Sequence, residues 1–287
     1  MITTSRIKQG LLRLTTALKT AWECVWTDFK QHEHSTPFVI VFLARTGSNY
    51  LAARLDSHCE IICHHELFNE DGPHRSLSVR DGVNRADIGS KAFRDKNPVA
   101  FLKQIFDVDR IVTKEPAKIA AIGFKMSPME NLPVFFALLA NRSVKKVVLR
   151  RDNILETYAS ILLALRTDAW IQFNEETAKT VPRSGQAGVF IDTKKYLRYA
   201  RKRNAFYAIV NFVGWVTRQI FFKIEYGQIG DDNVTRQLLA FLRTSTDKIL
   251  TDRTTKQNTL GLSQRIENFE EVRFALRGTM HTKFFGD

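Results

Sequence analysis

Arg45, Thr46, Gly47 and Ser48 follow directly after an apolar run at 38–44. A guanidinium group, two hydroxyl groups and a glycine in one turn are suited to binding an anion. The residues that come next have leucines at helical spacing, so we expect a helix to begin at the turn. Its unpaired amides and the positive end of its dipole would face the same anion. The stretch predicts a buried parallel strand, a phosphate-binding turn and a helix.

A second stretch later in the chain repeats this pattern. The apolar segment 144–149 ends in two arginines and leads into a predicted helix that Asp152 or Asn153 could cap. Ser160 lies inside this helix. Arginine supplies a planar fork of donors that suits phosphate, and serine adds a neutral donor. We therefore expect Arg151 and Ser160 to hold one phosphate between them.

Three polar residues, His64, His65 and Glu66, follow a short apolar strand. In open α/β sheets, ligands bind outside the carboxyl ends of the strands. We therefore expect these side chains to lie beside the first turn, near the same anion. Lys125, after a third predicted strand, and Lys256, in the tail, are candidates for contacts with substrate, or are surface lysines.

Several classes of site have no support. The first stretch lacks the Gly-x-x-x-x-Gly-Lys-Ser/Thr pattern of nucleoside triphosphatases, because its only glycine is Gly47 and no lysine follows at the required place. It also lacks the Gly-x-Gly-x-x-Gly pattern of dinucleotide folds. Cys24, Cys59 and Cys63 form no Cys-x-x-Cys pair and no metal-ligand spacing with the seven histidines. We expect no metal, no disulfide scaffold, and a reduced, cytoplasmic setting.

The periodicity predicts an α/β fold, a P-loop-like central parallel sheet flanked by helices, in a single domain with an N-terminal helix. With 287 residues and 44% hydrophobic content, the chain can bury one large core. We expect a helix over 1–36 and a domain over 37–287. Strands are predicted at 38–44, 60–63, 120–126, 144–149 and 221–226. Helices are predicted at 48–56, 98–106, 131–140, 153–161, 194–210 and 233–243. A mobile surface excursion at 69–96 and a long connection at 167–192 complete the prediction, and the tail from 253 has no clear periodicity.

The N-terminal segment has an apolar face and basic residues elsewhere. The face comprises Leu11, Leu12, Leu14, Leu18, Trp22 and Trp26. Two interpretations stay open: an accessory helix packed on the domain or on a partner chain, and a basic amphipathic helix lying on an anionic membrane. Arg13 interrupts the apolar cluster and no cleavage site follows, so we expect no secretory signal. No apolar run is long enough to span a bilayer.

The net charge of +13 is concentrated in the middle of the chain. Between Arg142 and Arg203 there are 14 lysines and arginines against 6 aspartates and glutamates. A basic field of this kind suits an anionic ligand, an anionic polymer or an anionic membrane surface.

Together the motifs resemble those of the sulfotransferase superfamily, and more closely those of bacterial carbohydrate sulfotransferases related to the trehalose and nodulation-factor enzymes. The family's segment after the first strand matches residues 44–50, and its second phosphate motif matches Arg151 and Ser160. Its C-terminal pattern is similar to Ile266-Glu267-Asn268-Phe269-Glu270 and to Leu276-Arg277-Gly278-Thr279. The resemblance covers roughly residues 37–285, with the middle loops unmatched.

This resemblance implies transfer of a sulfuryl group from 3′-phosphoadenosine 5′-phosphosulfate (PAPS) to a hydroxyl of a carbohydrate, glycolipid or oligosaccharide, without a metal. It implies that Arg45 stabilises the leaving phosphate, and that Arg151 and Ser160 bind the 3′-phosphate. The residues implied at the 5′-phosphate are Arg45, Thr46, Gly47, Ser48, Asn49 and Tyr50. Glu66 matches the base of the carbohydrate branch. Partial burial is expected to raise the pKa of Glu66 toward the useful range. His64 and His65 stay open as rivals, since the cytosolic branch uses histidine.

Two other functions stay open: a non-enzymatic basic anion-binding protein and a P-loop kinase-like phosphotransferase. No nucleic-acid motif is present, and aromatic residues do not interleave with the basic run. We expect a cytoplasmic protein, for which peripheral membrane contact through 1–36 and a homo-oligomer both stay open.

Overall fold

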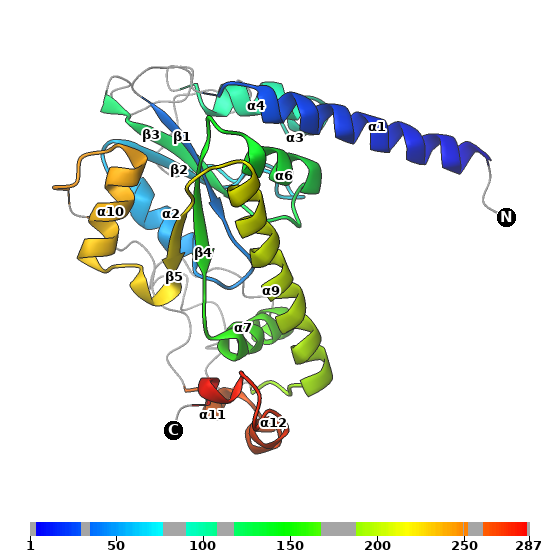
Figure 1. Ribbon diagram of the computed structural model, residues 1–287, viewed down its shortest axis with the longest axis vertical. Coiled ribbons are helices and arrows are strands. Elements are labelled where there is room, and N and C mark those ends of the chain that lie inside the picture. Colours follow the sequence, from blue (N-terminus) through cyan, green and yellow to red (C-terminus); the bar gives the residue numbers. More distant parts are fainter. Residues whose placement is uncertain are drawn as a thin grey trace.

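The computed structural model describes residues 4–29, 35–76, 90–107, 118–167, 188–248, 250–251 and 261–285. At its centre is a five-stranded sheet in the order β2-β3-β1-β4-β5. All four strand pairings are parallel. The strands are β1 Thr36–Val41, β2 Ile61–Glu66, β3 Ala121–Met126, β4 Lys145–Arg150 and β5 Phe222–Glu225. The predicted α/β fold with a central parallel sheet is therefore confirmed (Figure 1).

The middle strand, β1, fixes the edge at which the polar residues gather. Its last residue, Val41, pairs with Met126 at the end of β3 and with Val148 near the end of β4. The carboxyl ends of these three strands therefore lie at one edge. β2 pairs with β3 and not with β1. The expectation that the residues at the end of β2 lie directly beside the first turn is corrected, because β3 lies between them.

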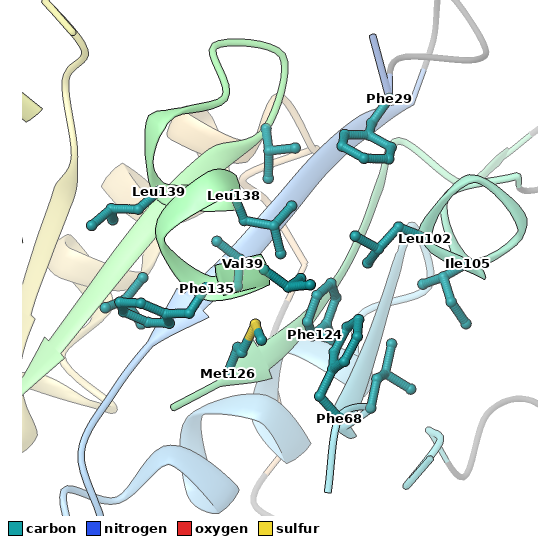
Figure 2. Packing of buried hydrophobic residues seen from close by; sticks show 14 of the residues in the cluster. Phe29, Val39, Phe68, Leu102, Ile105, Phe124, Met126, Phe135, Leu138 and Leu139 are labelled. Carbon is teal, nitrogen blue, oxygen red and sulfur yellow. The ribbon is translucent and has the colours of Figure 1, made fainter. Parts of the chain in front are cut away.

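The helices cover both faces of the sheet. Side chains of β1 alternate between the faces, so that Phe38 and Ile40 belong to one core cluster and Val39 and Val41 to the other. The face of Val39 packs against α1, α4, α6 and the second half of α9, and Figure 2 shows this cluster. The opposite face packs against α2 and α10. These helices are α1 Thr4–Trp26, α2 Ser48–Asp56, α4 Pro98–Ile105, α6 Leu132–Ala140, α9 Thr193–Val216 and α10 Asp232–Leu242.

The C-terminal part forms a third core cluster with α7 and the first half of α9. Asn268 links the C-terminal part to the segment before α9. Its side chain donates to the Ile191 carbonyl over 3.1 Å and accepts from the Ile191 amide over 2.9 Å. The sequence shows no clear periodicity here because the helices are short. The remaining elements are α3 Lys91–Lys96, α7 Ile154–Thr167, η3 Tyr226–Gln228, α11 Leu262–Arg265, α12 Phe269–Ala275 and η4 Thr282–Phe284.

The N-terminal helix α1 ends at Trp26, earlier than predicted. It packs on the domain through Cys24, which is buried in the core cluster with α4 and α6. The packing interpretation is therefore confirmed for the end of α1. Leu18, Trp22 and Trp26, which belong to the predicted apolar face, are nevertheless exposed. The division of the chain at residue 36 stays a prediction.

Several predicted features lie outside the described residues. They are Lys256, residues 30–34 of the helix predicted over 1–36, and the central parts of the two segments predicted at 69–96 and 167–192.

Candidate active site

The turn after β1 has an unusual backbone. Arg45 and Gly47 both have a positive φ, of 63° and 88°. The Thr46 hydroxyl donates to the Leu43 carbonyl over 2.7 Å and fixes the turn from inside. Gly47 is the N-cap of α2, and no side chain caps this helix in the described part of the chain. The first amides of α2 therefore remain available to an anion outside the turn.

Tyr226 closes the turn from the side of β5. A Cβ atom on Gly47 would lie 2.4 Å from Tyr226 Cδ2, so the ring packs directly on the glycine. The guanidinium carbon of Arg151 lies 4.4 Å from the centroid of the same ring. The position of Tyr226, directly after the last strand, was the only signal for it in the sequence. Tyr226 thus touches both predicted phosphate motifs.

The two predicted phosphate motifs meet at the carboxyl edge of the sheet. Arg45 Nε donates to the Ser160 hydroxyl over 2.9 Å, and Arg151 Nη1 donates to the Arg45 carbonyl over 3.3 Å. Helix α7 holds Ser160 in place, and it begins where the Asn153 side chain accepts from the Glu156 amide over 2.9 Å. The structure therefore brings Arg45, Arg151 and Ser160 together.

Further arginines surround this group. Glu156 Oε1 contacts Arg151 Nη2 over 2.6 Å and Arg265 Nη2 over 3.2 Å, so one carboxylate bridges two guanidinium groups. Arg203 donates from Nη2 to the Arg151 carbonyl. Burial, together with the charge of Arg151, lowers the pKa of Arg45. One carboxylate among four arginines leaves a strong positive field, which an anionic ligand would balance.

The sequence did not point to Arg203 or Arg265 as site residues. Arg203 ends the basic stretch 142–203, which predicted a positive field but no particular site residue. Arg265 directly precedes the Ile266 motif, and this adjacency was the only signal for it.

The remaining residues of the first motif lie at the start of α2. Ser48 is buried and Asn49 is partly exposed. The hydroxyl of Tyr50 accepts from Arg54 Nη1 over 3.5 Å, one turn further along the helix. The side chain of Tyr50 is therefore engaged with its own helix, whereas its backbone belongs to the anion-binding turn.

Glu66 ends β2 and makes an ion pair with Lys125 of the neighbouring strand. Asn69 Nδ2 also donates to Glu66 Oε2 over 2.9 Å, and the Glu66 side chain is 25% exposed. Burial alone would raise the pKa of Glu66, but the charge of Lys125 and the hydrogen bonds from Lys125 and Asn69 lower it below its ordinary value. The expected rise in pKa was wrong because the sequence did not show this partner.

Lys125 connects Glu66 to the first turn. It lies on β3, between β2 and β1, and its side chain is 1% exposed. Its ammonium nitrogen is 4.7 Å from the centroid of Phe42, the residue that follows β1. Of the two candidate lysines, Lys125 is therefore buried beside Glu66 and is not a surface lysine.

His64 and His65 are the rivals of Glu66. Burial is the main cause that lowers the pKa of each to about 4, so both imidazoles are neutral at pH 7. His64 is fully buried, and its Nδ1 accepts from the Ser76 amide over 3.1 Å. Glu66 is thus more exposed than His64, and unlike the two neutral imidazoles it carries a negative charge.

A second carboxyl group that the sequence did not indicate, Glu130, belongs to the same neighbourhood. Its Oε1 accepts from the Ser127 amide over 2.7 Å. Burial, with the charge of Glu66 adding to it, raises the pKa of Glu130 to about 7. Glu66 and Glu130 therefore differ in protonation near neutral pH.

The fold and site define an α/β protein in which two predicted anion-binding turns meet at the carboxyl edge of a parallel sheet. No group of three or more metal-ligating side chains occurs within the described ranges. Nor does any helix in those ranges have the length and hydropathy needed to cross a bilayer.

The chain is similar to several known proteins over most of its length. No family model matches the chain. It is similar to nodulation protein H of Rhizobium tropici, with 25% identity over 254 residues, which covers 87% of this chain and 92% of the relative. Nodulation protein H of Rhizobium meliloti strain 1021 is 27% identical over 269 residues, covering 88% and 97%. A solved sulfotransferase from Alicyclobacillus acidocaldarius aligns with a TM-score of 0.46 and 17% identity, over 87% of this chain and 91% of that one.

The similarity to the two nodulation proteins extends over most of both chains and agrees with the resemblance that the motifs predicted.

Proposed function

We propose that the protein transfers the sulfuryl group of PAPS to a hydroxyl group of a carbohydrate or glycolipid. The observation that carries this proposal is the hydrogen-bonded group of Arg45, Ser160 and Arg151 beside the uncapped N-terminus of α2. PAPS carries one phosphate at its 5′ position and another at its 3′ position. A site with two adjoining phosphate motifs suits such a donor better than it suits a nucleotide with one phosphorylated end.

The first motif holds the 5′-phosphate in this proposal. The amides at Gly47, Ser48, Asn49 and Tyr50 and the Ser48 hydroxyl surround it, and Thr46 keeps the turn closed. Arg45 lies where negative charge grows on the bridging oxygen as the sulfur–oxygen bond breaks, so it stabilises the transition state more than the ground state.

The second motif holds the 3′-phosphate. Arg151 presents a planar guanidinium group whose position is fixed by Tyr226 and Glu156, and Ser160 adds a hydroxyl. Because Ser160 also contacts Arg45, the two phosphates are held by one connected set of side chains. This connection favours in-line geometry, since the donor is fixed at both ends.

Glu66 takes the proton of the acceptor hydroxyl. As that proton moves to the Glu66 carboxylate, the acceptor oxygen forms a bond to sulfur. The bond from sulfur to the 5′-phosphate oxygen breaks, releasing a sulfate ester and adenosine 3′,5′-bisphosphate. The lowered pKa keeps Glu66 ionised at neutral pH, and its ion pair with Lys125 orients the carboxylate.

The nucleotide selectivity of the protein tests the donor assignment. Adenosine 3′,5′-bisphosphate should bind about 10- to 100-fold more tightly than 5′-AMP by calorimetry, because a charged hydrogen bond contributes about 1.5–3 kcal/mol. Arg151→Ala should remove most of this preference, whereas the exposed Arg236→Ala serves as a matched control and should keep it. Equal affinity of the wild-type protein for both nucleotides would refute the proposal.

The acceptor class is proposed from the resemblance to carbohydrate sulfotransferases and from the nodulation protein relatives. Incubation with labelled PAPS and a panel of oligosaccharides, glycolipids and phenols tests it. Label should appear on a sugar hydroxyl, and transfer to phenols alone would contradict the carbohydrate assignment.

A further inference from the structure

Large apolar side chains are exposed at the C-terminal ends of α1 and α9. We name this set the tryptophan surface. Its members and their exposed fractions are Trp22 68%, Trp26 70%, Phe212 60%, Trp215 76% and Ile220 86%. Exposed tryptophans that come together in a folded domain usually mark an interaction surface.

One buried asparagine brings the two helix ends together. Asn141 Nδ2 donates to the carbonyls of Cys24 and Thr27, each over 2.7 Å, at the end of α1. Gln219 Nε2, just after α9, donates to the neighbouring Ala140 carbonyl over 2.9 Å. The ends of α1 and α9 therefore meet at the C-terminal end of α6, which lies between the two helices in Figure 1. This brings the two helix ends that carry the five side chains together.

The sequence of α9 shows that its exposed apolar residues are not misplaced core residues. The helix already buries a separate stripe, which comprises Tyr196, Ala200, Arg203, Tyr207, Val210 and Gly214. Its outer face is basic in the first half, but residues 204–216 contain no charged residue at all. Ile209, Phe212 and Trp215 are exposed in this second half. The uncharged outer face is thus additional to the face that packs on the domain.

Exposed arginines flank the tryptophan surface. Arg142, just after α6, and Arg218, just after α9, are both exposed at the junction of the helix ends. On α1, Glu23 is paired with Lys19 over 3.8 Å, and Asp28 is exposed just after the helix. The basic residues in the first half of α9 lie toward the carboxyl end of β4 and do not contribute here. The region therefore offers aromatic side chains beside two exposed arginines.

We propose that the tryptophan surface docks on a membrane that contains anionic lipids. Tryptophan rings favour the boundary between headgroups and acyl chains, and the arginines contact anionic headgroups. A second copy of the chain fits less well, because a two-fold contact would bring each Arg142 and Arg218 close to like charges. The inference does not depend on the proposed reaction.

Docking in this way leaves the candidate active site open. Asn141 precedes the first residue of β4, whereas Arg151 follows the last, so the tryptophan surface and the arginines lie at opposite ends of this strand. The carboxyl edge of the sheet would face away from the bilayer.

Sedimentation of the full chain with vesicles tests the proposal. The wild-type protein should bind vesicles of phosphatidylcholine and phosphatidylglycerol, and should bind phosphatidylcholine vesicles much more weakly. The double variant Trp26→Ser/Trp215→Ser should bind about tenfold more weakly or worse, since two aromatic side chains leave the interface. Phe274→Ser removes a similarly exposed aromatic from α12 and should bind as the wild type does.

The variants should melt within a few degrees of the wild type, because the replaced side chains are exposed. Fluorescence provides a readout that does not depend on sedimentation: emission of the wild-type protein should be quenched by brominated acyl chains, and that of the double variant much less. No vesicle binding by the wild type, or equal binding by the double variant, would overturn the proposal. A dimer in solution that the double variant dissolves, without vesicle binding, would overturn it in favour of a second copy.

Discussion

Replacing Gly47 by alanine would test the contact between Tyr226 and the turn that follows β1. The new methyl group would lie 2.4 Å from Tyr226 Cδ2, and the residue would have to keep a φ of 88°. The left-handed conformation costs a residue with a Cβ about 1–2 kcal/mol. Overpacking against the ring adds about 1–3 kcal/mol. The sum predicts that Gly47→Ala lowers the free energy of unfolding by about 2–5 kcal/mol.

A double-mutant cycle separates the two costs. Tyr226→Ala opens the space beside Gly47. In the double variant, Gly47→Ala should therefore no longer have the overpacking cost but should still have the cost of the left-handed backbone. The coupling energy should therefore be about 1–3 kcal/mol. Tyr226→Phe keeps the ring carbons that make the contact, and it should give no recovery.

Urea unfolding of the single and double variants measures these quantities, and calorimetry with adenosine 3′,5′-bisphosphate shows whether the site survives. Because Tyr226 also contacts Arg151, the single variants should bind this nucleotide more weakly than the wild type does. Additive destabilisation within about 0.5 kcal/mol would refute the packing of Tyr226 on Gly47.

Two further predictions concern buried charges. Glu66→Gln should lower kcat by about 10²- to 10⁴-fold while affinity for adenosine 3′,5′-bisphosphate stays unchanged, and the exposed Glu70→Gln should leave both unchanged; a rate within a few-fold of wild type would mean that Glu66 is not the base. Burial lowers the pKa of Lys146 from 10.5 to about 7, so between these values the unfolded chain binds more protons and stability rises with pH. From pH 7 to pH 9, the free energy of unfolding of the wild type should rise by about 2 kcal/mol more than that of Lys146→Met, as measured by urea unfolding. The exposed Lys223→Met serves as the control and should follow the wild type. Parallel pH profiles for wild type and Lys146→Met would contradict the assignment.

Those parts of the site that depend on local sequence were predictable. Each phosphate motif is one strand, one turn and the start of one helix, so apolar runs followed by Arg45 and by Arg151 were enough to locate them. The positive φ of Arg45 was not predictable, since glycine is the usual residue in that conformation and the glycine stands two positions later.

The parts that depend on strand order were not predictable. Tyr226 reaches Gly47 and Arg151 only because β5 pairs with β4, and Lys125 reaches Glu66 only because β3 lies between β1 and β2. The lowered pKa of Glu66 follows from the pairing of β2 with β3, which brings Lys125 beside it. Spacing along the chain contains no direct information about which strands become neighbours, so the sequence indicated the candidate base but not its partner.

The length of α9 has a consequence for how the two ends of the molecule influence each other. Arg203 contacts the backbone of Arg151, and α9 ends at Val216 thirteen residues later, which corresponds to about 20 Å along a helix. Gln219, just beyond that end, contacts Ala140. Electrostatic screening in physiological salt acts over about 8 Å. A negative charge that approaches one end is therefore hardly sensed at the other. In the proposed function and the proposed docking, a multiply charged nucleotide at one end and an anionic surface at the other would therefore not compete for the same cations.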